Sequence, residues 1–144
     1  MCQRILSTSI SMLCGFSLYA QTIHLEISGI KNPEGQICVA FFNSKEAFKK
    51  EKPLLEVIYN KQTRMKNGRI EDNVVLKPGI YGISVLDDED SNGRMRFNLI
   101  GIPQEGFGFG NFEIKGLKKP AFDKFSFEIK AGESKTIRVM MQYL

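Results

Sequence analysis

The sequence predicts an all-β protein, a single antiparallel β-sandwich of about seven strands, of the immunoglobulin-like or transthyretin-like type. Apolar and polar residues alternate with a period of two along most of the chain, as they do in half-buried strands. Turn signals rich in glycine, proline and asparagine separate these segments at regular spacing. The chain has no pattern for a long helix and no alternation of strands with helices, so two packed sheets are the expected architecture.

The first two expected strands are separated by a turn that contains proline and glycine. Residues 22–30 alternate between apolar and polar side chains, which predicts a strand with one buried face. Residues 36–42 are almost all apolar and suit a central strand, in which Cys38 is expected to be a buried, inert thiol. A short helical turn over residues 44–50 follows, and Pro53 ends it.

A hairpin is expected in the middle of the chain. Residues 54–65 and 69–76 have strand patterns, and Asn67-Gly68 lies between them. Because both of these turn residues tolerate positive φ, the pair is a strong hairpin signal. The remaining expected strands cover residues 80–86, 122–129 and 136–143.

The N-terminal segment has the layout of a secretory signal. A basic start is followed by a short apolar middle at residues 5–18 and by Ala20, a small residue at the cut. The apolar part is too short to span a bilayer, which needs roughly 20 apolar residues. We therefore expect a signal peptide over residues 1–20 and one exported domain over residues 21–144, periplasmic or extracellular and without a membrane span. A lipid anchor at Cys14 is the alternative.

Composition argues against two features of the exported domain. Cys38 is the only cysteine that remains after signal cleavage, so an internal disulfide cannot form. The formal net charge of the chain is +4, and its basic residues form neither a stripe nor a recognisable nucleic-acid-binding module. We therefore expect no nucleic-acid partner.

The expected strand at 80–86 leads into four consecutive acids, Asp87 to Asp90. The residues after Asp87 match the first half of a calcium loop, D-x-[DN]-x-[DN]-G, in which alternate residues point oxygens at one centre. The expected calcium ligands are the side chains of Asp88, Asp90 and Asn92 and the carbonyl of Arg94, with Glu105 or Asn98 closing the shell. A turn in which Arg94 and Arg96 fold back onto the acids explains the same residues without a metal, and both readings stay open.

A glycine-rich run, residues 101–112, completes this central stretch. It does not lead into a helix, so it does not resemble a phosphate-binding loop. Its alternation of glycine with phenylalanine fits a loop that lies flat on a sheet edge with the rings tucked in. The alternative is a ligand platform, and the residues of this candidate binding loop are Phe107, Phe109 and Asn111.

Several motifs of the chain match the pattern of a known family. They are Tyr81-Gly82-Ile83-Ser84, then Asp88, Asp90 and Asn92-Gly93, then the run from Gly101 to Asn111, and Pro120-Ala121-Phe122 downstream. In these motifs the chain resembles a secreted bacterial family of uncharacterised proteins, domain of unknown function number 2141. The resemblance implies a single exported β-sandwich domain of unknown biochemical activity. Asp87 stands where the family has histidine, which weakens a proton-transfer or transition-metal role, and Arg96 stands where it has aspartate, which places positive charge beside the ion.

The sequence predicts a non-catalytic module of the cell envelope that presents residues 86–112 to a protein or glycan partner. A structural, calcium-stabilised envelope domain is the alternative. A hydrolase that uses Asp88 and Glu105 is more remote, because glycosidase chemistry needs two carboxyl groups about 5–9.5 Å apart in a cleft. Calcium is the only cofactor that the sequence suggests.

Overall fold

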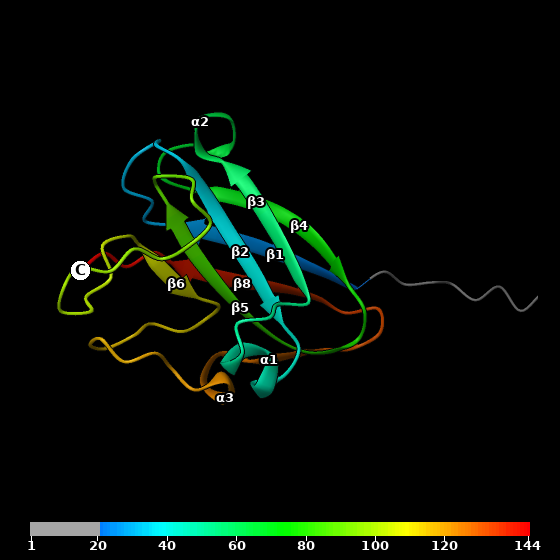
Figure 1. The fold of residues 1–144 in the computed structure, drawn as a ribbon. Helices are drawn as coiled ribbons and strands as arrows, with labels where there is room; N and C mark the ends of the chain where they lie inside the picture. The colour runs from blue at the N-terminus through cyan, green and yellow to red at the C-terminus, as the bar shows by residue number, and fades with distance from the viewer. Residues whose placement is uncertain (1–20) are drawn as a thin grey trace, which may run out of the picture.

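The computed structural model describes residues 21–144 (Figure 1). The predicted signal peptide and the alternative anchor at Cys14 lie outside the described residues.

The all-β prediction is confirmed, because two sheets pack face to face with a core between them. Strands β1 (Gln21–Ser28), β4 (Ile70–Leu76) and β8 (Ser134–Met140) form one sheet in the order β4-β1-β8. The second sheet has the order β3-β2-β5-β6, with β7 pairing to β5, and its strands are β2 (Gln36–Phe42), β3 (Leu55–Asn60), β5 (Gly79–Asp88), β6 (Phe107–Phe109) and β7 (Phe127–Ile129).

One strand pairing differs from the antiparallel pattern that the sequence predicted. Strands β1 and β8 pair in parallel, with Leu25 opposite Ile137, whereas β1 and β4 pair antiparallel. A parallel pair cannot be joined by a tight turn and needs a long connection. Nearly the whole domain separates β1 from β8, so this requirement is met.

The five-stranded sheet is covered on its inner face and on part of its outer face. Its inner face contributes Ile37, Val39 and Phe41 to the main core. A second cluster covers part of the outer face, where helices α1 (Lys45–Lys49) and α3 (Phe122–Phe125) lie side by side (Figure 1). This cluster contains the rings of Phe42, Phe48, Phe109, Phe122 and Phe125.

Two segments that were predicted as strands contain short helices instead. The predicted strand 54–65 ends at Asn60, whose side chain accepts the N–H of Thr63 and caps α2 (Lys61–Arg64). The first half of the predicted strand 122–129 is α3, because Phe122 and Phe125 are spaced to bury on one helical face. The tight turn at Asn67-Gly68 forms as predicted, since both residues have positive φ and Lys66 bridges to Arg69. The predicted hairpin was wrong, because β3 and β4 on either side of the turn belong to different sheets.

The prediction that Cys38 lies in the core was wrong. Neighbouring residues of a strand point to opposite faces of a sheet, and in β2 it is Ile37 and Val39 that point inward. Cys38 is half-buried on the outer face. The apolar run suggested burial of both faces, but the second cluster covers only the half of the strand near Phe42.

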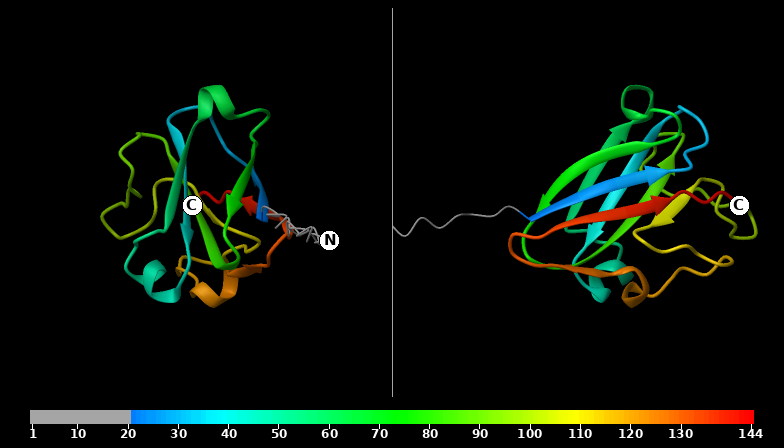
Figure 2. Two further views of the ribbon diagram at one scale, coloured as in Figure 1. Left: turned by 90° about the vertical axis from the view of Figure 1, so that its right-hand side faces the viewer. Right: turned by 180° about the vertical axis from the view of Figure 1, so that it is seen from behind.

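The acidic loop, residues 89–105, leaves the end of β5 and stands off the side of the sandwich (Figure 2). The C-terminus lies at the same end of the molecule (Figures 1 and 2). Residues 21–144 include no helix that is both long and apolar enough to cross a membrane.

Candidate metal centre

Strand geometry separates the first two acids of the run. Asp87 and Asp88 are the last residues of β5, so their side chains point to opposite faces of the five-stranded sheet. Both side chains are fully buried. Asp87 therefore extends the inner face at the end of the main core, whereas Asp88 lies on the outer face beside the acidic loop. The four acids do not form one continuous negative patch.

Asp87 is neutralised by a lysine from a distant part of the sequence. The Nζ of Lys61, at the start of α2, lies 2.5 Å from one Asp87 carboxylate oxygen, and Lys61 is fully buried. The hydroxyl of Tyr143 donates to the other oxygen at 2.6 Å, and burial together with this bond raises the pKa of Tyr143. Lys61 also donates to the side chain of Asn32 at 3.1 Å. This buried network fixes the end of β5, from which the acidic loop starts.

Asp88 is held as a carboxylate by a different set of donors. Its oxygens accept hydrogen bonds from the side chain of Gln36 at 2.7 Å and from the backbone N–H groups of Asn92 and Gly93 at 3.0 and 2.8 Å. Burial raises the pKa of Asp88, but the bonds from Gln36 and Gly93 outweigh burial and hold that pKa below its usual value. Asp88 is therefore ionised at neutral pH.

The loop brings two more carboxylates to Asp88. One carboxylate oxygen from each of Asp88, Asp90 and Glu105 lies within 4.8 Å of the others. Two oxygens bound to one calcium ion at about 2.3–2.6 Å can be no further apart than about 5 Å. These three side chains are therefore close enough to bind a single cation, and we call them the carboxylate cluster.

Glu105 is the member of the cluster that has a buried oxygen without a hydrogen-bond partner among the described residues. It is only 1% exposed, and its Oε2 accepts the backbone N–H of Arg96 at 3.1 Å. Its Oε1 is buried and has no hydrogen-bond partner among the described residues. Burial and the charges of Asp90 and Asp88 raise the pKa of Glu105, against the hydrogen bond from Arg96. Buried polar atoms in folded proteins almost always have a partner, so a water molecule or a cation is expected beside this oxygen.

Arginine supplies part of the neutralisation that the sequence suggested. The Nη1 of Arg96 lies 3.6 Å from Asp90, and both side chains are partly exposed. An exposed ion pair of this kind contributes about 0–1 kcal/mol. It balances one carboxylate at the surface and leaves the buried charges of Asp88 and Glu105 close together. The arginine-neutralised turn therefore accounts for only part of the cluster.

The two asparagines among the predicted ligands shape the turn of the loop. The amide oxygen of Asn92 accepts the backbone N–H of Arg94 at 2.8 Å, and the Asn92 amide group donates to Asp90 at 3.0 Å. Asn98, the alternative closing residue, accepts the N–H groups of Ile100 and Ile102. Of the predicted ligand side chains, the structure thus brings together Asp88, Asp90 and Glu105, and uses the two asparagines to form turns.

The candidate binding loop packs against the sandwich. Phe109 is buried in the second cluster, and Phe107 is half-buried against it. A Cβ atom on Gly108 would lie 2.5 Å from Val139, so only glycine lets this strand lie so close to β8. Asn111 is exposed, and its side chain accepts the backbone N–H of Arg138. This arrangement matches the flat loop with tucked rings and not the ligand platform.

Sequence reasoning missed the residues that hold the two aspartates of β5. These are Lys61, Tyr143 and Gln36, which come from α2, the C-terminus and β2. The only sequence signal among them is Asn60, a favourable helix cap that places Lys61 in the first turn of a helix. Nothing local distinguishes a lysine that will be buried from one that stays in solvent.

Cys38 is expected to react slowly with a thiol reagent in the native protein. Burial and the neighbouring Asp88 carboxylate raise the pKa of the thiol to about 12. Because the thiolate is the nucleophile, native alkylation at mildly alkaline pH should be on the order of 100-fold slower than alkylation of the urea-unfolded chain. Timed iodoacetamide labelling in chelator, followed by mass spectrometry, measures this ratio. Equal rates would contradict the position of Asp88 beside the thiol.

Comparison with known proteins agrees with the resemblance in the sequence. The model of a family described as "Uncharacterized protein conserved in bacteria (DUF2141)" matches residues 25–138. Searches of curated proteins and of solved structures gave no match. The matched segment runs from β1 to β8 and includes the whole carboxylate cluster. The chain therefore belongs to the DUF2141 family of uncharacterised bacterial proteins.

Proposed function

We propose that the chain is an exported, non-catalytic β-sandwich module that binds Ca²⁺ through Asp88, Asp90 and Glu105 and presents the adjoining loop to a partner in the cell envelope. The observation that carries this proposal is the buried, unpartnered Oε1 of Glu105 within a group of three carboxylates. A cation at the cluster would give this oxygen a partner and would balance the two buried charges. Calcium is the cation whose size and preference for several carboxylate oxygens fit such a group.

A binding role fits the hydrogen bonding of the carboxylates better than hydrolysis does. One oxygen of Asp88 lies within 4.8 Å of one oxygen of Glu105, close enough for both to bind a single cation. The oxygens of Asp88 are moreover engaged by Gln36 and by the loop backbone. Proton transfer to a substrate would have to break these bonds.

The charge of Glu105 is expected to stabilise the fold when calcium is bound and to leave it unchanged or less stable in chelator. In chelator, Glu105→Gln should be as stable as the wild type or about 1 kcal/mol more stable, because it removes an unpaired buried charge. With about 1 mM Ca²⁺ and a dissociation constant of about 0.1–1 mM, the wild type should gain about 0.4–1.4 kcal/mol. That gain corresponds to a melting shift of roughly 1–6 °C for a domain of this size. Calorimetric melting of both proteins in both buffers measures the two effects.

A matched substitution tests whether the loss of the calcium-dependent melting shift is specific to the carboxylate cluster or follows from removing any negative charge. Glu113 is exposed in a loop outside the cluster, so Glu113→Gln should keep the full calcium shift. The Glu105→Gln variant should lose it. A calcium shift that is equal in the wild type and in Glu105→Gln would place the ion elsewhere and reject the proposal.

A further inference from the structure

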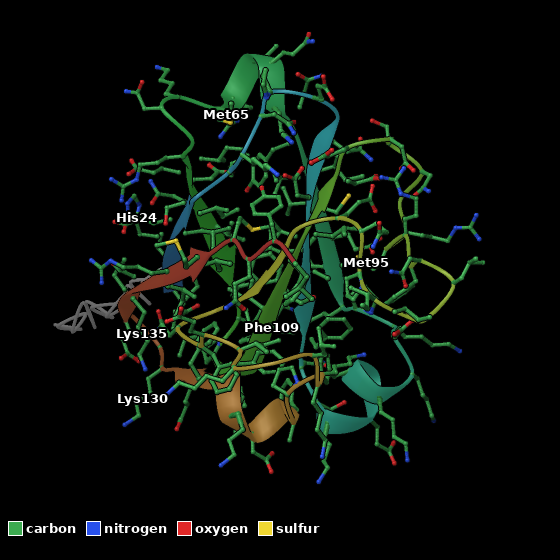
Figure 3. All side chains as sticks on the ribbon, turned by 90° about the vertical axis from the view of Figure 1, so that its left-hand side faces the viewer. His24, Met65, Met95, Phe109, Lys130 and Lys135 are labelled. Carbon is green, nitrogen blue, oxygen red and sulfur yellow. The ribbon has the colours of Figure 1, made fainter. Side chains whose placement is uncertain are left out.

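The acidic loop carries an apolar tip, residues 97–100, whose three large apolar side chains are exposed. Leu99 is fully exposed, Ile100 is 80% exposed and Phe97 is 57% exposed. Figure 3 looks onto this end of the molecule, with Met95 marking the loop. Three large apolar side chains that stand together on a protruding loop usually mark a surface that is covered in the functional state.

The tip is an ordered structure, held by its own backbone. Phe97 pairs with Pro103 across the loop, and the N–H of Asn98 donates to Ile102 at 3.0 Å. The Asn98 side chain accepts the N–H groups of Ile100 and Ile102 at 3.0 and 2.9 Å. The apolar side chains are therefore presented outward by a formed turn, so docking the tip would cost little ordering entropy.

The charges beside the tip indicate which kind of surface would cover it. Arg94 and Arg96 immediately precede the tip and are exposed, and of the two Arg96 is ion-paired, 3.6 Å from Asp90. Residues 91–104 contain no aspartate or glutamate. Apolar side chains flanked by arginine suit the interface of an anionic bilayer, where rings and aliphatic chains enter the acyl boundary and cations remain among the head groups.

We infer that the tip inserts Phe97, Leu99 and Ile100 into the surface of an anionic lipid bilayer. The calcium dependence of this docking rests on the proposed function. Glu105 lies at the base of the tip and accepts the N–H of Arg96. The carboxylates of Asp88, Asp90 and Glu105 repel anionic head groups, and a bound calcium ion removes most of that repulsion. Docking should therefore be stronger with calcium than in chelator.

Vesicle sedimentation tests this inference with the full exported domain. The probes are vesicles of phosphatidylcholine, alone or with about a quarter phosphatidylglycerol, in calcium and in chelator. The wild type should bind the anionic vesicles in calcium and should bind the neutral vesicles far less. The double variant Leu99→Ser, Ile100→Ser should bind about tenfold or more weakly, because it removes two inserting side chains. Arg94→Gln should weaken binding about fivefold.

A matched control removes apolar surface elsewhere. Val75 and Leu117 are also well exposed but lie outside the loop, so Val75→Ser, Leu117→Ser should bind vesicles as the wild type does. Calcium titration by calorimetry should give the same affinity for both double variants and the wild type. Circular dichroism melting checks that both variants fold.

The outcomes distinguish the two proposals. Unchanged vesicle binding by the tip variant, or no vesicle binding by a wild type that does bind calcium, overturns the inference. Equal binding to neutral and anionic vesicles would show that the tip does not require an anionic bilayer. Self-association that the tip variant abolishes, seen by analytical ultracentrifugation without vesicle binding, identifies a second copy as the occupant instead. Vesicle binding that depends on the tip but is equal in calcium and in chelator supports the tip inference. If calorimetry also detects no calcium binding, the proposed function is rejected.

Discussion

Replacing Lys61 with methionine is expected to destabilise the domain by about 3–5 kcal/mol, the largest single-residue effect that the structure predicts. Methionine fills most of the space of the lysine side chain but leaves the Asp87 carboxylate buried without its counter-charge. Tyr143 alone would then remain on that carboxylate. Urea unfolding measures the free-energy change directly, because a loss of this size moves the midpoint well outside experimental error.

A second substitution, at Asp87, tests whether the unpaired buried charge causes the loss of stability. In the double variant Lys61→Met, Asp87→Asn, no buried charge remains, and the asparagine can still accept the hydroxyl of Tyr143. The loss should then fall to about 1–2 kcal/mol. Lys135→Met, which removes a partly exposed ion pair to Glu133, should cost less than about 1 kcal/mol. A cost of that small size for Lys61→Met would contradict the buried pair.

Gly35→Ala is expected to cost about 2–5 kcal/mol and to weaken the calcium response. Gly35 has a φ of +73°, which costs a residue with a side chain about 1–2 kcal/mol. A Cβ atom there would also overlap the carbonyl oxygen of Asp88 and lie 2.5 Å from that of Glu89. Backbone atoms cannot rotate away, so overpacking adds about 1–3 kcal/mol. The overlap would push the start of the acidic loop away from Gln36.

The matched control is Gly116→Ala, in a loop outside the site. Gly116 also has positive φ, +95°, but a Cβ atom there would have no neighbour within 4 Å. This variant should show the backbone cost alone and should keep the full calcium-dependent melting shift. If Gly35→Ala behaves like Gly116→Ala in both stability and calcium response, the turn of Gly35 does not support the acidic loop.

Much of the fold could be predicted because strand alternation and turn chemistry are local. The alternation of residues 22–30 indicated β1, and Asn67-Gly68 specified a tight turn through positive φ. The turn did not make a hairpin, because β3 and β4 pair with strands of different sheets. The helices α2 and α3 were missed for a physical reason. Each has only four residues, so the sequence carries almost no helical period. The Asn60 side chain caps α2, whereas α3 has no side-chain cap and depends on the burial of Phe122 and Phe125.

The site was predicted in part. The spacing of Asp88 and Asp90 indicated two members of the carboxylate cluster, and Glu105 was named although 14 residues separate it from Asp90. The opposite orientations of Asp87 and Asp88 were not predicted, because the expected strand ended at residue 86 whereas β5 extends to Asp88. The partner of Asp87 was not predicted either. Lys61 reaches Asp87 through tertiary packing, and no local pattern encodes a contact between residues that are 26 positions apart.

The position of the ion is the most direct test of the metal centre. Crystals grown in calcium and measured at a long wavelength should show an anomalous peak about 2.3–2.6 Å from oxygens of Asp88, Asp90 and Glu105, including Oε1 of Glu105. The metal centre would be contradicted if no anomalous peak lies between the three carboxylates and Oε1 of Glu105 instead contacts a water molecule or the guanidinium of Arg96.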